Sequence, residues 1–234
     1  MTERIVLASG TPLQVAGTPD APRGLLVIQE AFGVNDHMRH VAQEFADQGY
    51  YAVLPELFHR TGSPEVAYDD FARARPSMEA LNPDDLRDDL AAAAEFLGHA
   101  GYPTAATGSV GYCMGGTVSF YANTLGLVGA AVTFYGGGVT TGRFGLAPLV
   151  DLAPSLRAPW LGLYGDLDQS IPPEQVEALR ASAATASVDT DIVRYANADH
   201  GFSCDGRPAV YNAEASRDAK ARTLAFFDRR LATK

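Results

Sequence analysis

The hydrophobic residues of this chain follow two alternating patterns. Continuous apolar runs are typical of strands buried on both faces of a sheet, and they predict strands at Gly24–Gln29, Tyr50–Leu54, Thr107–Tyr112, Leu127–Tyr135, Pro159–Tyr164 and Val188–Tyr195. The amphipathic stretches between these runs predict helices at His40–Gln48, Asp84–Gly98, Gly115–Leu125, Pro173–Thr185 and Ala213–Leu231. This alternation predicts an α/β fold, with a mainly parallel central sheet covered by helices on both faces.

Two regions depart from the alternation. The segments Glu3–Ala8 and Pro12–Thr18 predict a short antiparallel strand pair at the start of the chain. The stretch Thr61–Pro83 mixes prolines with charged and aromatic residues, and we interpret it as a surface excursion with a short helix near Val66–Ala74. No internal repeat, low-complexity tract or linker divides the sequence, so we expect one domain over residues 1–234.

The composition narrows the class of protein. Hydrophobic residues make up 47% of the 234 residues, enough for a sizeable core, and no apolar run reaches the length of a transmembrane helix. The N-terminal sequence lacks the pattern of a signal peptide, so we expect a cytoplasmic protein. The formal net charge of −10 argues against nucleic acid or an anionic membrane surface as a partner. We therefore expect a small-molecule ligand, bound by a monomer or a small homo-oligomer.

The cysteines and histidines do not form a recognisable metal site. Two cysteines are too few for a disulfide framework, and neither Cys-x-x-Cys nor a zinc-type spacing occurs. His37 and His40 lie three residues apart on an expected helix, where one face can carry both. Because no cysteine or patterned acid is near them in the sequence, we interpret them as surface histidines. The sequence therefore predicts neither a metal site nor a cofactor.

The most informative segment is Gly111–Gly115, which reads Gly-Tyr-Cys-Met-Gly between an apolar strand and a helix. This is the Gly-x-nucleophile-x-Gly pattern of a nucleophile elbow, with cysteine where serine is usual. Glycines two residues before and after the nucleophile let neighbouring chain pass close to a sharply turned backbone. The turn places Cys113 at a helix N-terminus, where unpaired amides favour a thiolate or an oxyanion. The alternative is a buried cysteine in a glycine-rich turn.

A nucleophile on such an elbow needs a general base and an acid that orients the base, and both follow it in the chain. Ligand-binding groups of parallel sheets lie just past the carboxyl ends of strands. Asp166 and Asp168 both follow the strand Pro159–Tyr164, and either can be the orienting acid. His200 is the only histidine after Cys113 and follows the next predicted strand, so we interpret it as the general base.

Taken together, these segments resemble the dienelactone hydrolases, the cysteine branch of the α/β-hydrolases. The resemblance runs from about Gly24 to Phe227, and five blocks carry it: Gln29–Asn35, Gly111–Gly116, Tyr135–Gly136, Asp168–Pro172 and His200–Phe202. It implies the α/β-hydrolase fold and a catalytic triad of Cys113, Asp168 and His200. It also implies a cofactor-free carboxylic ester hydrolase that cleaves a lactone through an acyl-cysteine intermediate, as a carboxymethylenebutenolidase does.

The resemblance also implies roles that spacing alone does not. In the family, the glutamate that matches Glu30 contacts the resting nucleophile and helps to activate it when substrate arrives. The backbone amides of Ala31 and Met114 would form the oxyanion hole, and Asp166 would be a turn or capping residue. Four neighbouring aromatic residues either line the substrate pocket or belong to the core: Phe32, Tyr112, Tyr135 and Phe202.

The chain departs from the family where a substrate carboxylate would bind. The family resemblance implies an arginine four residues after the catalytic histidine, and this chain has Cys204 there. Arg207 is the nearest arginine to that position and can bind the substrate carboxylate instead. Arg73 and Arg75 are candidates for a second carboxylate-binding arginine. If none of these arginines reaches the pocket, the substrate lacks a carboxylate. Cys204 also raises the hypothesis of a reversible disulfide that silences Cys113, against the alternative of a free loop thiol.

Other functions compete with a lactone hydrolase. A broader esterase or lactonase would act on uncharged short-chain substrates, and a non-catalytic module of the same fold would only bind a ligand. A binding module has no need of Cys113, Asp168, His200 and Glu30 together, which argues against it. A thiol redox protein has only the two cysteines in its favour.

Overall fold

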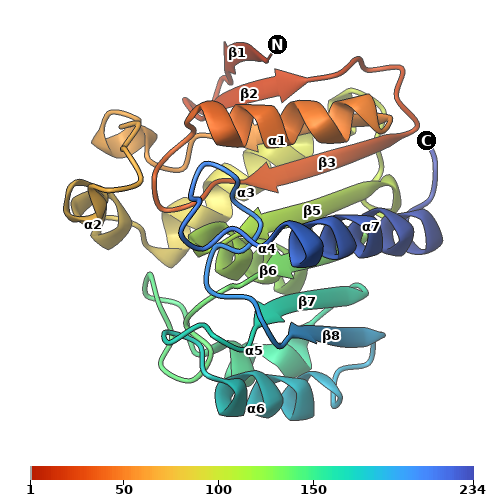
Figure 1. Ribbon diagram of the computed structural model, residues 1–234. Helices are drawn as coiled ribbons and strands as arrows, with labels where there is room; N and C mark the ends of the chain where they lie inside the picture. The colour runs from red at the N-terminus through yellow and green to blue at the C-terminus, as the bar shows by residue number, and fades with distance from the viewer. Residues whose placement is uncertain (1) are drawn as a thin grey trace.

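The computed structural model describes residues 2–234, in which eight strands form a single sheet in the order β1-β2-β4-β3-β5-β6-β7-β8 (Figure 1). The strands are β1 (Glu3–Val6), β2 (Pro12–Ala16), β3 (Arg23–Ile28), β4 (Tyr50–Pro55), β5 (Thr107–Tyr112), β6 (Ala130–Phe134), β7 (Trp160–Gly165) and β8 (Thr190–Tyr195). Strands β3 to β8 are parallel, whereas β2 pairs antiparallel with both β1 and β4. The predicted, mainly parallel sheet is confirmed.

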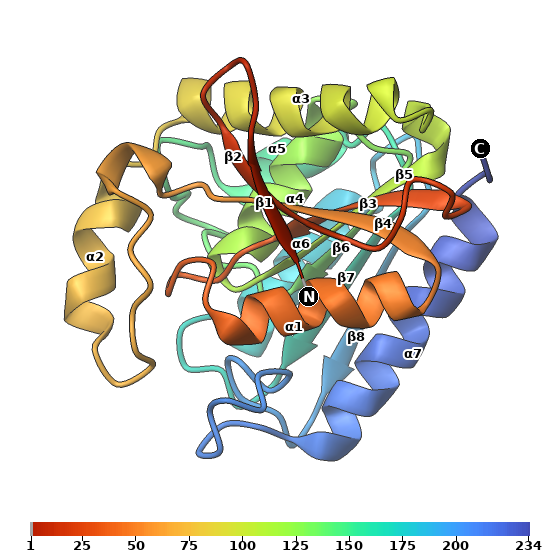
Figure 2. The same ribbon diagram turned by 90° about the horizontal axis from the view of Figure 1, so that it is seen from above.

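Helices cover both faces of this sheet, as Figure 2 shows from above. The α-helices are α1 (Asp36–Asp47), α2 (Phe71–Glu79), α3 (Pro83–His99), α4 (Met114–Thr124), α5 (Leu149–Leu152), α6 (Pro173–Ala183) and α7 (Ala213–Arg230). Short 3-10 turns lie at η1 (His59–Thr61), η2 (Thr104–Ala106) and η3 (Ala153–Ser155). Helices α1 and α7 share one face and α3, α4 and α6 the other, whereas α2 lies beyond the end toward which β3 points (Figure 1). None of the helices in residues 2–234 is both long and apolar enough to cross a membrane.

The core has two layers, one on each side of the sheet. Phe45 of α1 and Phe227 of α7 are buried in one layer, and Leu90 of α3 is buried in the other with Trp160 of β7. Trp160 also donates a hydrogen bond from Nε1 to Thr133 Oγ1 at 3.0 Å, so its polar atom is satisfied inside the core. Because both faces are covered, the parallel strands read as continuous apolar runs rather than as alternating ones.

Capping residues move two helix boundaries from their predicted positions. Helix α1 begins at Asp36, before the predicted apolar stretch His40–Gln48, because Asn35, the N-cap that the sequence offers, accepts a hydrogen bond from the Met38 amide and caps a polar first turn. Helix α2 begins later than predicted, because Asp70 caps it through the amide of Arg73. The short helix α5 was not predicted, since four residues are too few for a helical period.

The junction of β5 and α4 depends on two glycines. A Cβ on Gly111 would overlap the carbonyl oxygen of Gly115, and a Cβ on Gly115 would overlap the carbonyl oxygen of Ile28 in β3. Both obstacles are backbone atoms, which cannot rotate away as a flexible side chain can. The end of β3, the end of β5 and the start of α4 therefore approach this closely only because both positions lack a side chain.

We expect Gly115→Ala to lower the free energy of unfolding by about 1–3 kcal/mol, because its methyl group overlaps a fixed carbonyl of β3. Gly98→Ala is the matched control, since Gly98 is exposed in α3 and a Cβ there meets no atom within 4 Å. Alanine at that helical position should raise the free energy of unfolding by up to about 1 kcal/mol. Urea unfolding followed by circular dichroism measures both, and equal effects of the two substitutions would contradict the packing argument.

Candidate active site

Cys113 lies at the turn between β5 and α4 with φ of 55° and ψ of −116°. A positive φ is strained for a residue that carries a Cβ. Two backbone hydrogen bonds hold the turn: the Cys113 amide donates to the carbonyl of Phe134 in β6 at 3.1 Å, and the Cys113 carbonyl accepts from the Gly116 amide at 3.0 Å. The sequence Gly111–Gly115 thus folds as a strained strand-to-helix turn, with a partly exposed thiol at the N-terminus of α4.

The thiol of Cys113 is the first of three hydrogen-bonded groups. Its sulfur lies 3.1 Å from Nε2 of His200, and Nδ1 of His200 lies 2.6 Å from Oδ2 of Asp168. Cys113 follows β5, Asp168 follows β7 and His200 follows β8. Because parallel strands end at the same edge of a sheet, residues far apart in the sequence meet there.

The second oxygen of Asp168 is held by its own loop. Oδ1 accepts hydrogen bonds from the amide and hydroxyl of Ser170 at 2.8 and 2.6 Å, and from the amide of Ile171 at 3.2 Å. Asp166, the other acid that the sequence left open, instead forms an ion pair with Arg194 of β8 at 2.7 Å. The geometry therefore pairs the imidazole with Asp168.

Charges within this group of side chains shift their pKa values. Burial lowers the pKa of His200, but the adjacent sulfur of Cys113 and the carboxylate of Asp168 outweigh it and raise that pKa from 6.5 to about 10. Burial acts to raise the pKa of Asp168, but its hydrogen bond to His200 and the imidazolium charge lower that pKa below 3.8. At neutral pH the imidazole therefore keeps a proton between the carboxylate of Asp168 and the sulfur of Cys113.

The residues expected to form an oxyanion hole come from adjacent segments. Met114 begins α4, and amides of the first helical turn have no partner within the helix. Gly115 packs against the carbonyl of Ile28, so this helix N-terminus lies beside the segment that carries Ala31 after β3. The packing brings the two predicted segments to the same edge of the sheet as the nucleophile.

The four aromatic residues expected near the site are all buried. Tyr112 and Phe202 pack against the same ring in β6, with centroid distances of 4.6 and 6.2 Å, and belong to the core layer under α1 and α7. Tyr135 lies against the imidazole of His200, with ring centroids 5.1 Å apart. Phe32 packs edge-on against aromatic rings of α2 and of the segment before it. Tyr135 thus contacts the imidazole as well as the core, and a pocket role for the four rings stays a prediction.

Comparison with known proteins identifies the family, because the model of the dienelactone hydrolase family matches residues 14–231. The chain belongs to the dienelactone hydrolase family. It is 36% identical to a protein of Escherichia coli O157:H7 that is provisionally named carboxymethylenebutenolidase, over 87% of this chain and 75% of that one. It is 31% identical to the carboxymethylenebutenolidase of Pseudomonas putida, over 91% of this chain and 89% of that one.

Structural comparison agrees with this assignment. The fold is similar to the crystal structure of a provisionally assigned dienelactone hydrolase from Klebsiella pneumoniae subsp. pneumoniae MGH 78578. The TM-score is 0.83 and the identity 31%, over 97% of this chain and 98% of that one. The resemblance inferred from the elbow and its flanking blocks is confirmed, and so is the α/β-hydrolase fold. As a member of the dienelactone hydrolase family, the protein is a hydrolase that acts on ester bonds.

Glu30 differs from what the family resemblance implied. The prediction was a contact between this carboxylate and the resting thiol of Cys113, but the thiol is paired with His200 instead. Glu30 is buried at the end of β3, where Oε2 accepts a hydrogen bond from the hydroxyl of Tyr68 at 3.2 Å. Its other oxygen, Oε1, is buried and has no hydrogen-bond partner among the described residues. Tyr68 gave no signal in the sequence, because it is one aromatic residue in an irregular stretch.

The arginine and cysteine positions after His200 also depart from the family. Cys204 is fully buried, and its burial together with the charge of Glu30 raises the pKa of its thiol to about 12. Both cysteines are free thiols in the described part of the chain, so the disulfide stays a hypothesis. Arg207 lies over Phe32, with Cζ 5.8 Å from the centroid of its ring, whereas Arg73 and Arg75 are exposed on α2.

His37 is not the surface residue that the sequence predicted. The side chain of His40 is 64% exposed, but that of His37 is only 11% exposed and turns inward from α1. A nitrogen of His37 and ligand atoms of Glu30 and Cys204 all lie within 4.8 Å of one another. The sequence analysis sought a cysteine next to the histidines in the chain, whereas Cys204 comes from the loop after β8.

We expect Cys113→Ala to lower the pKa of His200 from about 10, because it removes the sulfur that helps to retain the imidazole proton. Since the folded-state pKa lies above 6.5, this group stabilises the fold fully below pH 6.5 and loses its contribution as the pH rises toward 10. NMR titration of the His200 imidazole measures the pKa directly. Cys204→Ser is the matched control and should leave that pKa unchanged. An unaltered pKa in Cys113→Ala would contradict the coupling.

Proposed function

We propose that this member of the dienelactone hydrolase family opens lactones of the dienelactone type through an acyl-cysteine on Cys113. The observation that carries the proposal is the continuous series of contacts from the Cys113 sulfur through His200 to Asp168 at a strained elbow. The mechanism uses the thiolate, which is the nucleophilic form, and the sulfur lies beside Nε2 of His200 at the N-terminus of α4. The likeness to the carboxymethylenebutenolidase of Pseudomonas putida supports the substrate class.

Acylation begins when the Cys113 thiolate attacks the lactone carbonyl carbon and the carbonyl electrons move onto its oxygen. The amides of Ala31 and Met114 stabilise that oxyanion. As the ring C–O bond breaks, the leaving oxygen receives the Nε2 proton of His200. Because the substrate is cyclic, the released enol or alcohol stays tethered to the acyl group of the thioester.

Deacylation uses the same groups in reverse. The imidazole of His200, now neutral, takes a proton from water as the water oxygen attacks the thioester carbonyl. The tetrahedral intermediate then expels the Cys113 thiolate and releases the carboxylic acid product. Asp168 keeps the ring oriented and stabilises the imidazolium each time it forms. Water is the only co-reactant that this cycle consumes.

The substrate side of the site supports two alternatives within ester hydrolysis. Arg207 lies over Phe32 beside the segment of His200, where a guanidinium can bind a substrate carboxylate. Cys204 occupies the position of the family arginine and cannot do so, which favours a broader esterase on uncharged short-chain substrates as the second candidate. The two candidates share the mechanism and differ in whether a carboxylate on the substrate adds to binding.

We expect Asp168→Asn to lower kcat on p-nitrophenyl acetate and on a dienelactone by about 10²–10⁴-fold, because the imidazole loses its orienting acid. Asp166→Asn is the matched control and should keep kcat within about twofold, since this acid pairs with Arg194 and not with the imidazole. Cys113→Ala should abolish both turnover and the acylation burst. A large loss of kcat in Asp166→Asn with full activity in Asp168→Asn would show that Asp166, not Asp168, is the orienting acid. Absence of an acylation burst from the folded wild type would favour a non-catalytic binding module.

We expect Arg207→Met to raise KM for a carboxylate-bearing dienelactone by about 10- to 100-fold and to leave p-nitrophenyl acetate hydrolysis unchanged, because only the former carries a charge for the guanidinium. Arg73→Met, an exposed position on α2, is the control for loss of positive charge. Steady-state kinetics on both substrates separate the candidates. If the wild type hydrolyses p-nitrophenyl acetate but not the dienelactone, the protein is the broader esterase.

A further inference from the structure

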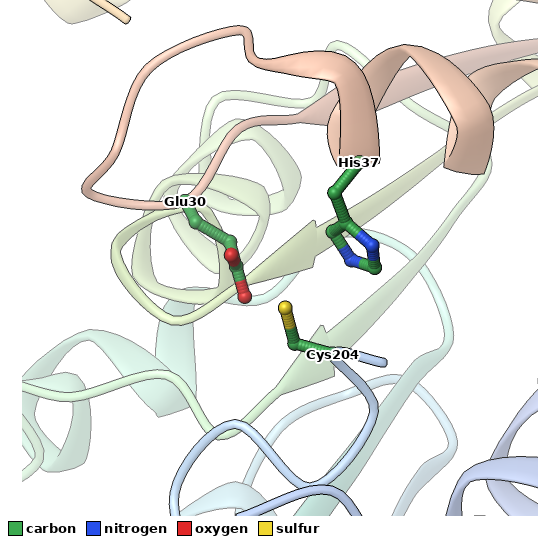
Figure 3. A group of neighbouring side chains, drawn as sticks. All are labelled: Glu30, His37 and Cys204. Atoms are coloured by element: carbon green, nitrogen blue, oxygen red, sulfur yellow. The ribbon is translucent and has the colours of Figure 1, made fainter. Parts of the chain in front are cut away.

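Three potential metal ligands from distant segments converge beside the proposed active site (Figure 3). Glu30 follows β3, His37 lies in the first turn of α1 and Cys204 lies in the loop after β8. A carboxylate oxygen, an imidazole nitrogen and the thiol sulfur all lie within 4.8 Å of one another. Figure 3 shows the three side chains directed toward a common space.

The carboxylate of Glu30 is the observation that calls for a ligand. The residue is only 1% exposed, and its Oε1 has no hydrogen-bond partner among residues 2–234. Burying a carboxylate oxygen without a partner is costly, and proteins compensate such groups by pairing or by coordinating a metal. The two other potential ligands lie within 4.8 Å of this carboxylate, and the hydroxyl of Tyr68 is hydrogen-bonded to both Glu30 and Cys204.

Each of the three side chains is also held by an outer partner. Tyr68 donates to Oε2 of Glu30, which leaves Oε1 available. Nδ1 of His37 lies 3.0 Å from Oδ1 of Asp205. In the tautomer that donates from Nδ1 to this carboxylate, Nε2 carries the lone pair that a metal ion binds. The amide of Gly206 donates to the sulfur of Cys204. Built metal sites show this arrangement, in which outer hydrogen bonds fix the orientation of the ligands.

We propose that Glu30, His37 and Cys204 form a binding site for a borderline divalent transition-metal ion of the Zn²⁺ class. One sulfur, one nitrogen and one oxygen donor suit zinc, whereas magnesium and calcium require oxygen ligands. Zinc bonds of about 2.0–2.3 Å place tetrahedral ligands about 3.5 Å apart, so small side-chain rotations close the site. On binding, the Cys204 S–H proton is released to solvent as the sulfur–metal bond forms, and no group is oxidised or reduced.

Occupancy of this site has a consequence for the hydrolase, and this consequence rests on the proposed function. The family resemblance implies that Glu30 helps to activate Cys113 when substrate arrives. An ion that coordinates Glu30 holds its carboxylate beside His37 and Cys204, so the carboxylate is not free to act on Cys113. We therefore expect Zn²⁺ to lower the rate of ester hydrolysis reversibly, with recovery when a chelator removes the ion.

The test uses the full-length, chelator-treated protein and Co²⁺ as a spectroscopic probe that replaces zinc. We expect an intense sulfur-to-cobalt charge-transfer band that saturates at an equimolar amount of Co²⁺ and disappears when Zn²⁺ displaces it. Cys204→Ser should remove this band, and His37→Gln should weaken Co²⁺ binding by at least about tenfold. The matched controls are Cys113→Ala, which removes the other thiol, and His40→Gln, which removes an exposed histidine of the same helix. Both should keep the band.

Circular dichroism establishes that each variant is folded. Asp205→Asn provides a second variant if the substitution of buried Cys204 prevents folding, because Asp205 is 64% exposed and acts only through His37. It should weaken Co²⁺ binding by about 10- to 100-fold. The proposal is overturned if the wild type shows no thiolate band at excess Co²⁺. It is equally overturned if the band persists in Cys204→Ser and is lost in Cys113→Ala, which would place the ion at the catalytic pair.

The spectrum does not depend on turnover, so its outcome is separate from that of the proposed hydrolysis. A protein that binds Co²⁺ through Cys204 but hydrolyses no ester supports the metal site and contradicts the proposed function. A protein that hydrolyses esters and shows no thiolate band contradicts the metal site alone. In a protein that shows the Cys204 band, hydrolysis that is unchanged by saturating Zn²⁺ overturns the link between the site and the activity of Glu30, whereas the site itself rests on the spectrum.

Discussion

The close approach of three backbone segments at the end of β5 is the constraint on which the site depends. Gly111 and Gly115 allow the start of α4 to pack against the end of β3, and the intervening residue takes a positive φ. That single turn fixes the direction of the Cys113 thiol, the position of the first amides of α4 and the neighbourhood of Ala31. Strain of this kind persists only where the surroundings over-determine the backbone, as the hydrogen bonds to Phe134 and Gly116 do here.

The direction of the strands explains why the remaining groups meet at this turn. In a parallel sheet every strand delivers its following loop to the same edge, so the loops after β3, β5, β7 and β8 become neighbours there. Asp168 is held by the amides of its own loop and in turn holds the imidazole of His200. The result is a rigid acid and a base whose charge state is set by its two neighbours rather than by solvent.

The two cysteines carry the same thiol group in two different environments. Cys113 lies partly exposed at a helix N-terminus, with its sulfur 3.1 Å from Nε2 of His200. Cys204 lies fully buried near the carboxylate of Glu30, and both effects favour the protonated thiol until a cation arrives. Where the family resemblance leads us to expect an arginine, this chain therefore has a soft metal ligand, and the carboxylate that faces it lacks a partner for one oxygen.

The sequence by itself determined the order of strands and helices, the mainly parallel sheet, the family and the elbow around Cys113. These follow from local patterns: apolar runs, helical periodicity and a glycine spacing that only one sharp turn requires. Without the family resemblance, the sequence did not distinguish Asp166 from Asp168 as the orienting acid. It also predicted that His37 lies at the surface. Only the tertiary structure decided that Asp168 faces His200 while Asp166 faces Arg194, and that Glu30, His37 and Cys204 share one space. The reason is that these contacts join loops that are adjacent at the sheet edge but remote in the chain, and no local pattern encodes such a pairing.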